Sequence, residues 1–182
     1  MEARHPAHAE FINQADGLPS YWAKVSLPRA DFHLWTRVTP MGTALVMDET
    51  LETLIIDDSP TDAQTLSYLL RKRLRCQVVT ASDGVEGLER LSSRRFDLVF
   101  LDLVMPQLNG IEVLKKIRSS ADNAELPVVV ISSHSEQETV CHLLQLKVFD
   151  YLIKPYNAEA LVKRLGMKMN ALRTRKSLTK EP

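Results

Sequence analysis

The feature that most constrains the fold is an alternation, from residue 51 onward, of short apolar runs with segments of helical periodicity. Five runs have the length of strands and are too short for core helices. They are residues 53–57 (TLIID), 77–80 (QVVT), 97–102 (DLVFLD), 127–132 (PVVVIS) and 150–153 (DYLI). The third and fourth runs are the most continuously apolar, as expected of strands covered by helices on both faces. The alternation predicts a parallel sheet built from βαβ units.

The segments between the runs have the end signals and the spacing of amphipathic helices. Ser59 is placed to cap the first helix, and Pro60 to occupy its first position. Apolar stripes follow at Ala63, Leu66, Leu69, Leu70 and Leu74, at Val140, Leu143 and Leu144, and at Leu161, Leu165, Met169 and Leu172. Five such units fit between residues 51 and 173, which predicts a flavodoxin-like, doubly wound, five-stranded sheet of order 2-1-3-4-5 with five helices.

Residues 1–50 have a different character and are predicted to form an irregular N-terminal extension. They hold Pro6, Pro19, Pro28 and Pro40 among the nine prolines of the chain, together with both tryptophans, and show no sustained period. The regular region, residues 51–173, is predicted to be one domain. Residues 174–182 follow it as a basic C-terminal tail.

The composition excludes several classes of protein. A formal net charge of zero gives no general attraction to nucleic acid or to an anionic membrane, and we expect neither as a partner. No apolar run reaches the roughly 18 residues of a membrane span, and the first 30 residues lack a secretory pattern, so we expect a cytoplasmic protein. The two cysteines, Cys76 and Cys141, form no zinc-binding pattern.

Polar side chains gather where the predicted strands end. Asp57 and Asp58 end the first strand and Asp102 the third, while Ser132 ends the fourth and Lys154 follows the fifth. In a doubly wound sheet, ligands bind beyond the carboxyl ends of the strands, where the strand order reverses. The three carboxylates should therefore converge there.

Three carboxylates a few ångströms apart repel one another unless a cation lies among them. Oxygen ligands of this kind suit a hard ion, and Mg²⁺ is the most available one. A metal ion and the Lys154 ammonium together would bind an anion, for which a phosphoryl group is the obvious candidate. Each of these residues alone has an ordinary structural explanation, such as a helix cap, but their position at one sheet edge favours a site.

The motifs IIDDSP, LDLVMPQLNG, VVVIS and DYLIKPY resemble those of the receiver domain of two-component response regulators, of the single-domain type. The separations of 45, 30 and 22 residues between Asp57, Asp102, Ser132 and Lys154 are similar to that family's, and the resemblance covers about residues 51–173. It implies phosphorelay signal transduction, in which a receiver accepts a phosphoryl group and changes its binding of partners.

The resemblance also implies a role for each matching residue. Asp102 would be the phosphoacceptor, and Asp57 and Asp58, with Asp102 and the Val104 carbonyl, would bind Mg²⁺. Lys154 would contact the phosphoryl group, and Ser132 and Tyr151 would form the switch. Val104 and His134, each two residues beyond a site residue, would modulate dephosphorylation.

One departure from the family concerns the end of the fourth helix. Where the family commonly has a Gly-Ala pair before DYLIKP, this chain has Lys147 and Val148. A left-handed cap would cost a residue other than glycine about 1 kcal/mol, so we expect this helix to end differently.

Three alternative functions remain. A phosphohydrolase of the haloacid-dehalogenase type needs a D-x-D pattern, but Val104 stands two residues after Asp102. A flavodoxin-like cofactor carrier needs a loop rich in Ser, Thr and Gly after the first strand, and this one is anionic. The third is a degenerate receiver that acts only as a protein-binding module.

We therefore expect a regulator with no enzymatic activity beyond its own aspartyl phosphorylation and dephosphorylation. Its partners would be a histidine kinase or a histidine phosphotransfer protein, and a downstream protein target.

Overall fold

The computed structural model describes residues 12–13, 18–19, 50–133, 143 and 145–178, and it divides the chain into two compact units. In the first unit, residues 1–42, strands β1 (Ile12–Asn13) and β2 (Leu18–Pro19) pair antiparallel. The second unit, residues 43–182, contains the predicted sheet. The predicted boundaries at residues 50 and 173 remain predictions.

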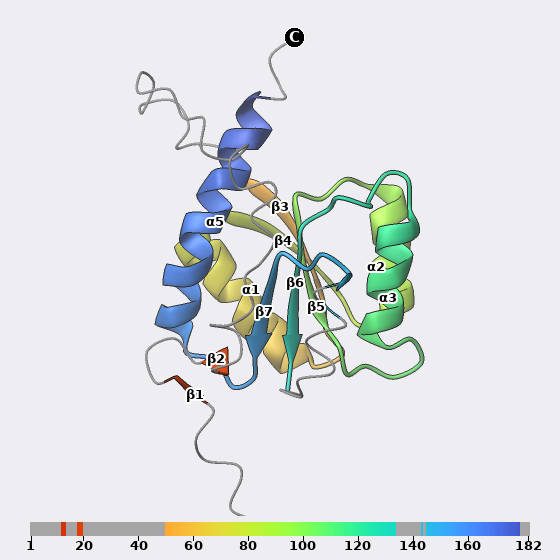
Figure 1. Ribbon diagram of the computed structural model, residues 1–182, viewed down its shortest axis with the longest axis horizontal. Helices are drawn as coiled ribbons and strands as arrows, with labels where there is room; N and C mark the ends of the chain where they lie inside the picture. Colours follow the sequence, from red (N-terminus) through yellow and green to blue (C-terminus); the bar gives the residue numbers. More distant parts are fainter. Residues whose placement is uncertain (1–11, 14–17, 20–49, 134–142, 144, 179–182) are drawn as a thin grey trace, which may run out of the picture. The chain divides into compact units, whose positions relative to one another are not determined.

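Five parallel strands form the sheet of the second unit (Figure 1). They are β3 (Leu51–Ile56), β4 (Cys76–Ala81), β5 (Leu98–Asp102), β6 (Val128–Ser132) and β7 (Asp150–Ile153). Their order, β4-β3-β5-β6-β7, is the predicted 2-1-3-4-5 order. Every residue of β5 and β6 is buried, as expected of strands covered on both faces.

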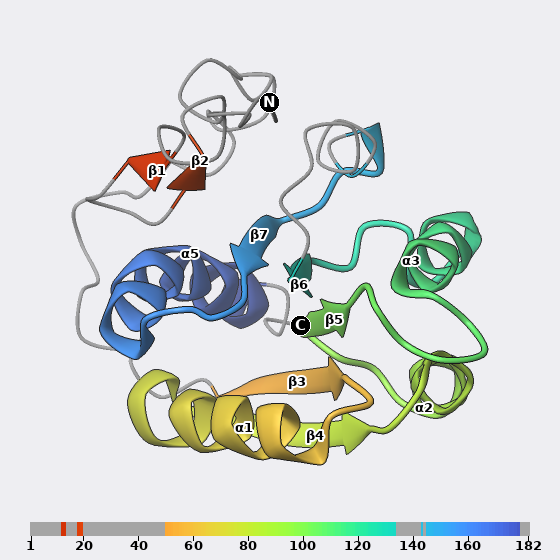
Figure 2. The same cartoon turned by 90° about the horizontal axis from the view of Figure 1, so that it is seen from below.

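Four helices of the described residues cover the sheet: α1 (Pro60–Leu74), α2 (Gly84–Ser93), α3 (Gly110–Ser119) and α5 (Ala158–Leu178). Helices α1 and α5 lie on one face of the sheet, and α2 and α3 on the other (Figures 1 and 2). The predicted fourth helix falls mostly on residues 134–142 and 144, outside the described residues. No helix in the described ranges has the length and apolarity needed to span a membrane.

Helix α1 forms where its end signals predict. The Ser59 side chain accepts a hydrogen bond from the Asp62 amide, and Pro60 is the first helical residue. The apolar stripe then packs into one core with that of α5: Ala63, Leu66, Leu70, Leu74, Leu161, Leu165, Met169 and Leu172 are all buried.

Helix α5 continues to Leu178, through residues predicted as the start of the basic tail. Two basic residues of its last two turns, one on each side of the predicted boundary, connect this part of the helix to the rest of the domain. Arg173 is buried and donates to the Leu74 carbonyl at the end of α1. Lys176 Nζ donates to the Thr50 carbonyl at 2.9 Å and to Asp97 Oδ2 at 2.7 Å. Part of the basic segment is therefore structural.

At the amino ends of the strands, acidic and basic side chains form a network of hydrogen bonds and ion pairs. Asp97 Oδ2 accepts from the Glu52 amide at 2.7 Å as well as from Lys176. The Glu52 carboxylate pairs with Arg94, whose guanidinium also lies over the Phe96 ring. Two carboxylates thus face two cations at this edge.

The expectation for the end of the fourth helix was wrong. Lys147 has a φ of 52°, so a lysine takes the left-handed conformation in place of glycine. The guanidinium of Arg118 on α3 explains how this is tolerated, because it donates to the carbonyls of Leu146 at 2.8 Å and Lys147 at 3.0 Å. These bonds offset the cost of the conformation.

Candidate functional site

The register of the sheet brings the predicted site residues to one edge. Ile56 pairs with Leu101, so Asp57 and Asp102 follow adjacent positions of neighbouring strands. Carboxylate oxygens of Asp57, Asp58 and Asp102 lie within 4.8 Å of one another. Asp57 and Asp102 are buried, whereas Asp58 is exposed. The predicted convergence of the three carboxylates is observed.

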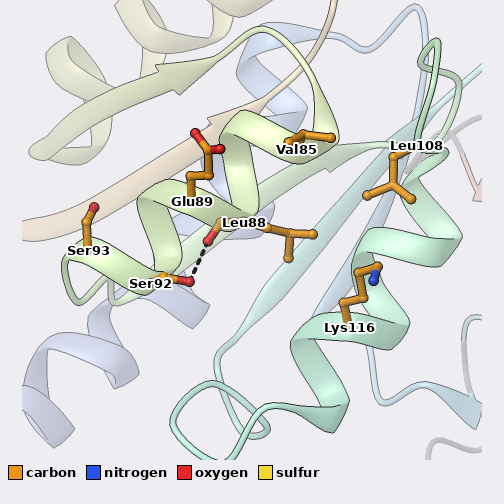
Figure 3. Close-up of a pocket in the computed structure, with 7 residues that line it drawn as sticks. All are labelled: Val85, Leu88, Glu89, Ser92, Ser93, Leu108 and Lys116. Carbon is orange, nitrogen blue, oxygen red and sulfur yellow. Dashed lines mark hydrogen bonds between the residues drawn. The ribbon is translucent and has the colours of Figure 1, made fainter.

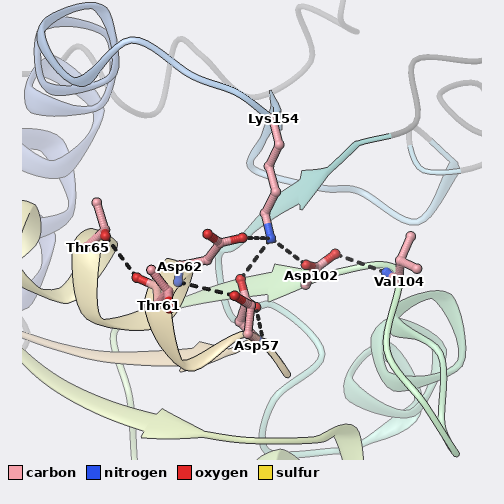
Figure 4. A network of polar contacts seen from close by, with 8 residues as sticks. Asp57, Thr61, Asp62, Thr65, Asp102, Val104 and Lys154 are labelled. Carbon is pink, nitrogen blue, oxygen red and sulfur yellow. Dashed lines mark hydrogen bonds and ion pairs between the residues drawn. The ribbon is translucent and has the colours of Figure 1, made fainter.

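Lys154 reaches into this cluster from the end of β7 (Figure 4). Its Nζ donates to Asp102 Oδ2 at 2.6 Å, to Asp62 Oδ2 at 2.9 Å and to Asp57 Oδ2 at 3.0 Å. Burial alone would lower the pKa of the lysine, but the bonds to these carboxylates outweigh it and raise the pKa. The ammonium is therefore charged at neutral pH.

The charge balance of the cluster is negative, because three carboxylates share this one ammonium and a fourth, that of Asp58, lies beside Asp57 and Asp102. Burial raises the pKa of Asp57, although hydrogen bonds from the Ser59 amide and from Lys154 act in the opposite direction. A buried carboxylate of this kind is destabilising when ionised, unless further positive charge arrives.

A glycine holds the backbone of Asp102 in place. A Cβ at Gly110 would lie 2.1 Å from the Asp102 carbonyl oxygen, so only glycine allows helix α3 to start this close to the end of β5. The Gly110 amide donates to the Leu103 carbonyl at 3.0 Å, and Asn109 caps the helix through the Glu112 amide. The Asn-Gly pair after Asp102 thus fixes the position of that carboxylate.

The Asp102 side chain is further oriented by the loop that follows it. Its Oδ1 accepts from the Val104 amide at 2.9 Å, while Oδ2 accepts from Lys154. The Val104 side chain is 50% exposed and carries no acid or amide group. His134, the other predicted modulator, lies outside the described residues.

The two predicted switch residues lie on neighbouring strands, and both are fully buried at 0% exposure. Ser132 ends β6, where its carbonyl accepts from the Lys154 amide at 2.9 Å. Tyr151 on β7 pairs with Val130, two residues before Ser132. Tyr151 is therefore a core aromatic residue in this structure.

The carboxylate set fits a hard divalent cation. The oxygens come from two buried side chains and one exposed side chain, which leaves part of the coordination shell to solvent or to a ligand. A pocket lies elsewhere, between α2 and α3, and is lined by Val85, Leu88, Glu89, Ser92, Ser93, Leu108 and Lys116 (Figure 3). It contains none of the clustered carboxylates.

Sequence reasoning missed Asp62, which contacts Lys154. The sequence does single out Asp62, but as part of a helix cap, since Ser59 and Asp62 have the spacing of a capping box at a helix start. Its contact with Lys154 joins residues 92 positions apart, and no local pattern predicts it.

Comparison with known proteins agrees with this geometry. Residues 53–166 match the family described as the response regulator receiver domain. The chain is 32% identical over 120 residues to the chemotaxis protein CheY-3 of Vibrio cholerae, covering 66% of this chain and 92% of CheY-3. The solved structure of the chemotaxis response regulator CheY4 of Vibrio cholerae is similar with a TM-score of 0.61 and 28% identity, over 66% of this chain and 99% of that one.

A longer relative shares only this region. The chain is 38% identical over 129 residues to a protein-glutamate methylesterase/protein-glutamine glutaminase of Myxococcus xanthus. The matched region is 68% of this chain but only 36% of that protein. The family match spans more than half of the chain, and 92% of CheY-3 is covered. This protein belongs to the response regulator receiver family.

Proposed function

We propose that this protein acts in phosphorelay signal transduction by accepting a phosphoryl group on Asp102. The observation that carries the proposal is the position of the Asp102 carboxylate. It is buried, fixed by Gly110 and the Val104 amide, 2.6 Å from Lys154 and within 4.8 Å of two further carboxylates. The donor would be a histidine kinase or a histidine phosphotransfer protein.

In the proposed reaction, an Asp102 oxygen forms a bond to phosphorus while the phosphorus–nitrogen bond of the donor phosphohistidine breaks. The electron pair of that bond stays on the imidazole nitrogen, which takes up a proton from solvent. Lys154 would donate to the transferred phosphoryl oxygens. We infer no other catalytic activity for the chain.

The residues that would hold Mg²⁺ are Asp57, Asp58 and Asp102. By the resemblance to the receiver family, the Val104 carbonyl would be a further ligand. The bound ion would supply positive charge that allows a phosphoryl dianion to approach these carboxylates. The protein itself contributes the orientation of Asp102, through the Val104 amide, and the partial exclusion of water around its buried carboxylate.

The test is the intact mass of the protein after incubation with acetyl phosphate and Mg²⁺. We expect one added phosphoryl group, and none when the metal is chelated. Asp102→Asn removes the nucleophile but keeps the shape of the side chain, so it should acquire no label. A label retained in this variant would refute the assignment of the acceptor.

We infer that Ser132 and Tyr151 pass the signal to a downstream protein. A phosphoryl group on Asp102 would attract the Ser132 hydroxyl, and the resulting shift would bias the packing of Tyr151 on the neighbouring strand. Val104 and His134 remain proposed as modulators of the phosphoryl lifetime.

The output proposal predicts that Ser132→Ala still accepts phosphate but loses most of the gain in partner binding on phosphorylation. Pull-downs of wild type and variant, each with and without acetyl phosphate, measure that gain directly. An undiminished gain in the variant would mean that the signal leaves by another route.

A further inference from the structure

Asp62, in the first turn of α1, does not accept the hydrogen bond that its position in the helix would predict, because Asp57 accepts that bond. In a capping box, the side chain at the third helical position accepts from the amide of the capping residue. Asp62 occupies that position, but the Ser59 amide donates instead to Asp57 Oδ1 at 2.8 Å. The Asp62 side chain turns to Lys154 and accepts from its Nζ at 2.9 Å (Figure 4).

The Lys154 ammonium has no donor left over. An ammonium carries three N–H donors, and here they serve three acceptors, one each on Asp57, Asp62 and Asp102. The phosphoryl group that approaches Asp102 also needs Lys154 as a donor. One of the three carboxylates must therefore give up its bond as this group arrives, before Asp102 has become an acyl phosphate.

Exposure identifies which bond is released at the lowest cost. The side chain of Asp62 is 45% exposed, against 2% for Asp57 and 7% for Asp102. Water can solvate Asp62 when it loses the lysine, whereas Asp57 is buried, and Asp102 keeps its buried negative charge until its bond to phosphorus forms. Asp62 is also outside the set of carboxylates that could hold a metal ion.

We propose that Asp62 is a positioning residue that occupies one Lys154 donor in the unphosphorylated protein and competes for it with the incoming phosphoryl group. Its negative charge also repels the phosphodonor, so Asp62 restrains phosphorylation. This inference rests on the proposed function, because it concerns the rate at which Asp102 is modified.

Asp62→Asn tests the proposal, since asparagine keeps an acceptor oxygen in the same place and removes the charge. The rate of phosphorylation is followed by intact mass over a range of acetyl phosphate concentrations. The half-saturating concentration should fall about two- to fivefold, the range that an exposed ion pair of up to about 1 kcal/mol allows. The maximal rate should change less, and Asp62→Glu should restore wild-type behaviour.

Glu112 offers a matched control. It occupies the third position of α3, as Asp62 does of α1, and its amide likewise donates to the capping side chain. Among the described residues, the ion pairs of Lys154 are with Asp57, Asp62 and Asp102 and not with Glu112. Glu112→Gln removes one charge from an equivalent helix position, so its half-saturating concentration should stay at the wild-type value.

A second readout does not depend on phosphorylation. The Lys154 ammonium should give a slowly exchanging signal in a ¹H–¹⁵N spectrum of lysine side chains, because all three donors are bonded. In Asp62→Ala this signal should broaden or disappear, while in Glu112→Gln it should persist. An unchanged signal in Asp62→Ala would overturn the proposal even if that variant were phosphorylated differently.

The kinetic outcomes separate the two claims. If wild type acquires no phosphoryl group, the proposed function fails. If wild type is labelled at Asp102 but Asp62→Asn is unchanged or slower, the proposed function stands and the role of Asp62 is refuted.

Discussion

The two ends of the sheet carry networks of acidic and basic side chains that differ in charge balance. At the amino ends of the strands, Asp97 and Glu52 face Lys176 and Arg94. At the carboxyl ends, Lys154 pairs with Asp57, Asp62 and Asp102, and the carboxylate of Asp58 adds a fourth negative charge to the cluster. The first network is balanced, and the second has an excess of negative charge.

We interpret this difference as one between a network that stabilises the fold and the proposed binding site. In the balanced network each carboxylate has a cation, and Asp97 also accepts a backbone amide, so the network stabilises the fold. In the other, burial raises the pKa of Asp57, so this group ionises less readily in the folded protein than in the unfolded chain. This excess of negative charge is consistent with the proposed binding of Mg²⁺.

The largest effect on stability is expected at the balanced edge. Asp97→Ala removes the acceptor of the Glu52 amide and the partner of Lys176, both partly buried. The free energy of unfolding should fall by about 2 kcal/mol, as measured by urea denaturation. Asp58→Ala at the other edge, where the carboxylate is exposed, should change it by less than about 0.5 kcal/mol. An equal loss of unfolding free energy in Asp97→Ala and Asp58→Ala would contradict the distinction between the two edges of the sheet.

A smaller effect of opposite sign is expected at the carboxyl edge. Asp57→Asn removes a charge from the negative cluster, so without Mg²⁺ at pH 7 the free energy of unfolding should rise by about 1 kcal/mol. Addition of Mg²⁺ should raise the melting temperature of the wild type and have less effect on the variant. If the variant is destabilised as Asp97→Ala is, the cluster is structural.

The pH dependence of stability in Asp57→Asn gives a further test of whether the charge of Asp57 destabilises the folded protein. Because the folded-state pKa of Asp57 lies above 3.8, the folded protein binds this proton more tightly than the unfolded chain does. The contribution of Asp57 to stability is therefore greatest below pH 3.8 and is lost as the pH rises through the raised pKa. The difference in stability between wild type and Asp57→Asn should follow this course in metal-free buffer.

Much of the fold could be predicted from the sequence because local periodicity determines it. The strands begin and end within two residues of the predicted runs, and Ser59 and Pro60 start α1 as expected. The convergence of Asp57, Asp58 and Asp102 also followed, since strand ends meet at one edge of a parallel sheet.

The features that were not predicted depend on contacts distant in sequence. The left-handed Lys147 depends on Arg118, 29 residues earlier, and the Asp62–Lys154 contact joins the first helix to the last strand. The helical residues up to Leu178 are held by Thr50 and Asp97 at the far end of the domain. The local sequence pattern around each of these residues does not indicate which distant residue it contacts.

The most direct test of the account measures phosphorylation and stability together in Asp102→Asn and Asp97→Ala. Intact mass after treatment with acetyl phosphate and Mg²⁺ reports acceptance of the phosphoryl group, and urea denaturation reports stability. We predict that Asp102→Asn acquires no label while its stability is equal to or above that of the wild type, and that Asp97→Ala is labelled while folded but is less stable. A labelled Asp102→Asn, or a folded Asp97→Ala that cannot be labelled, would contradict the assignment of function to the carboxyl edge of the sheet.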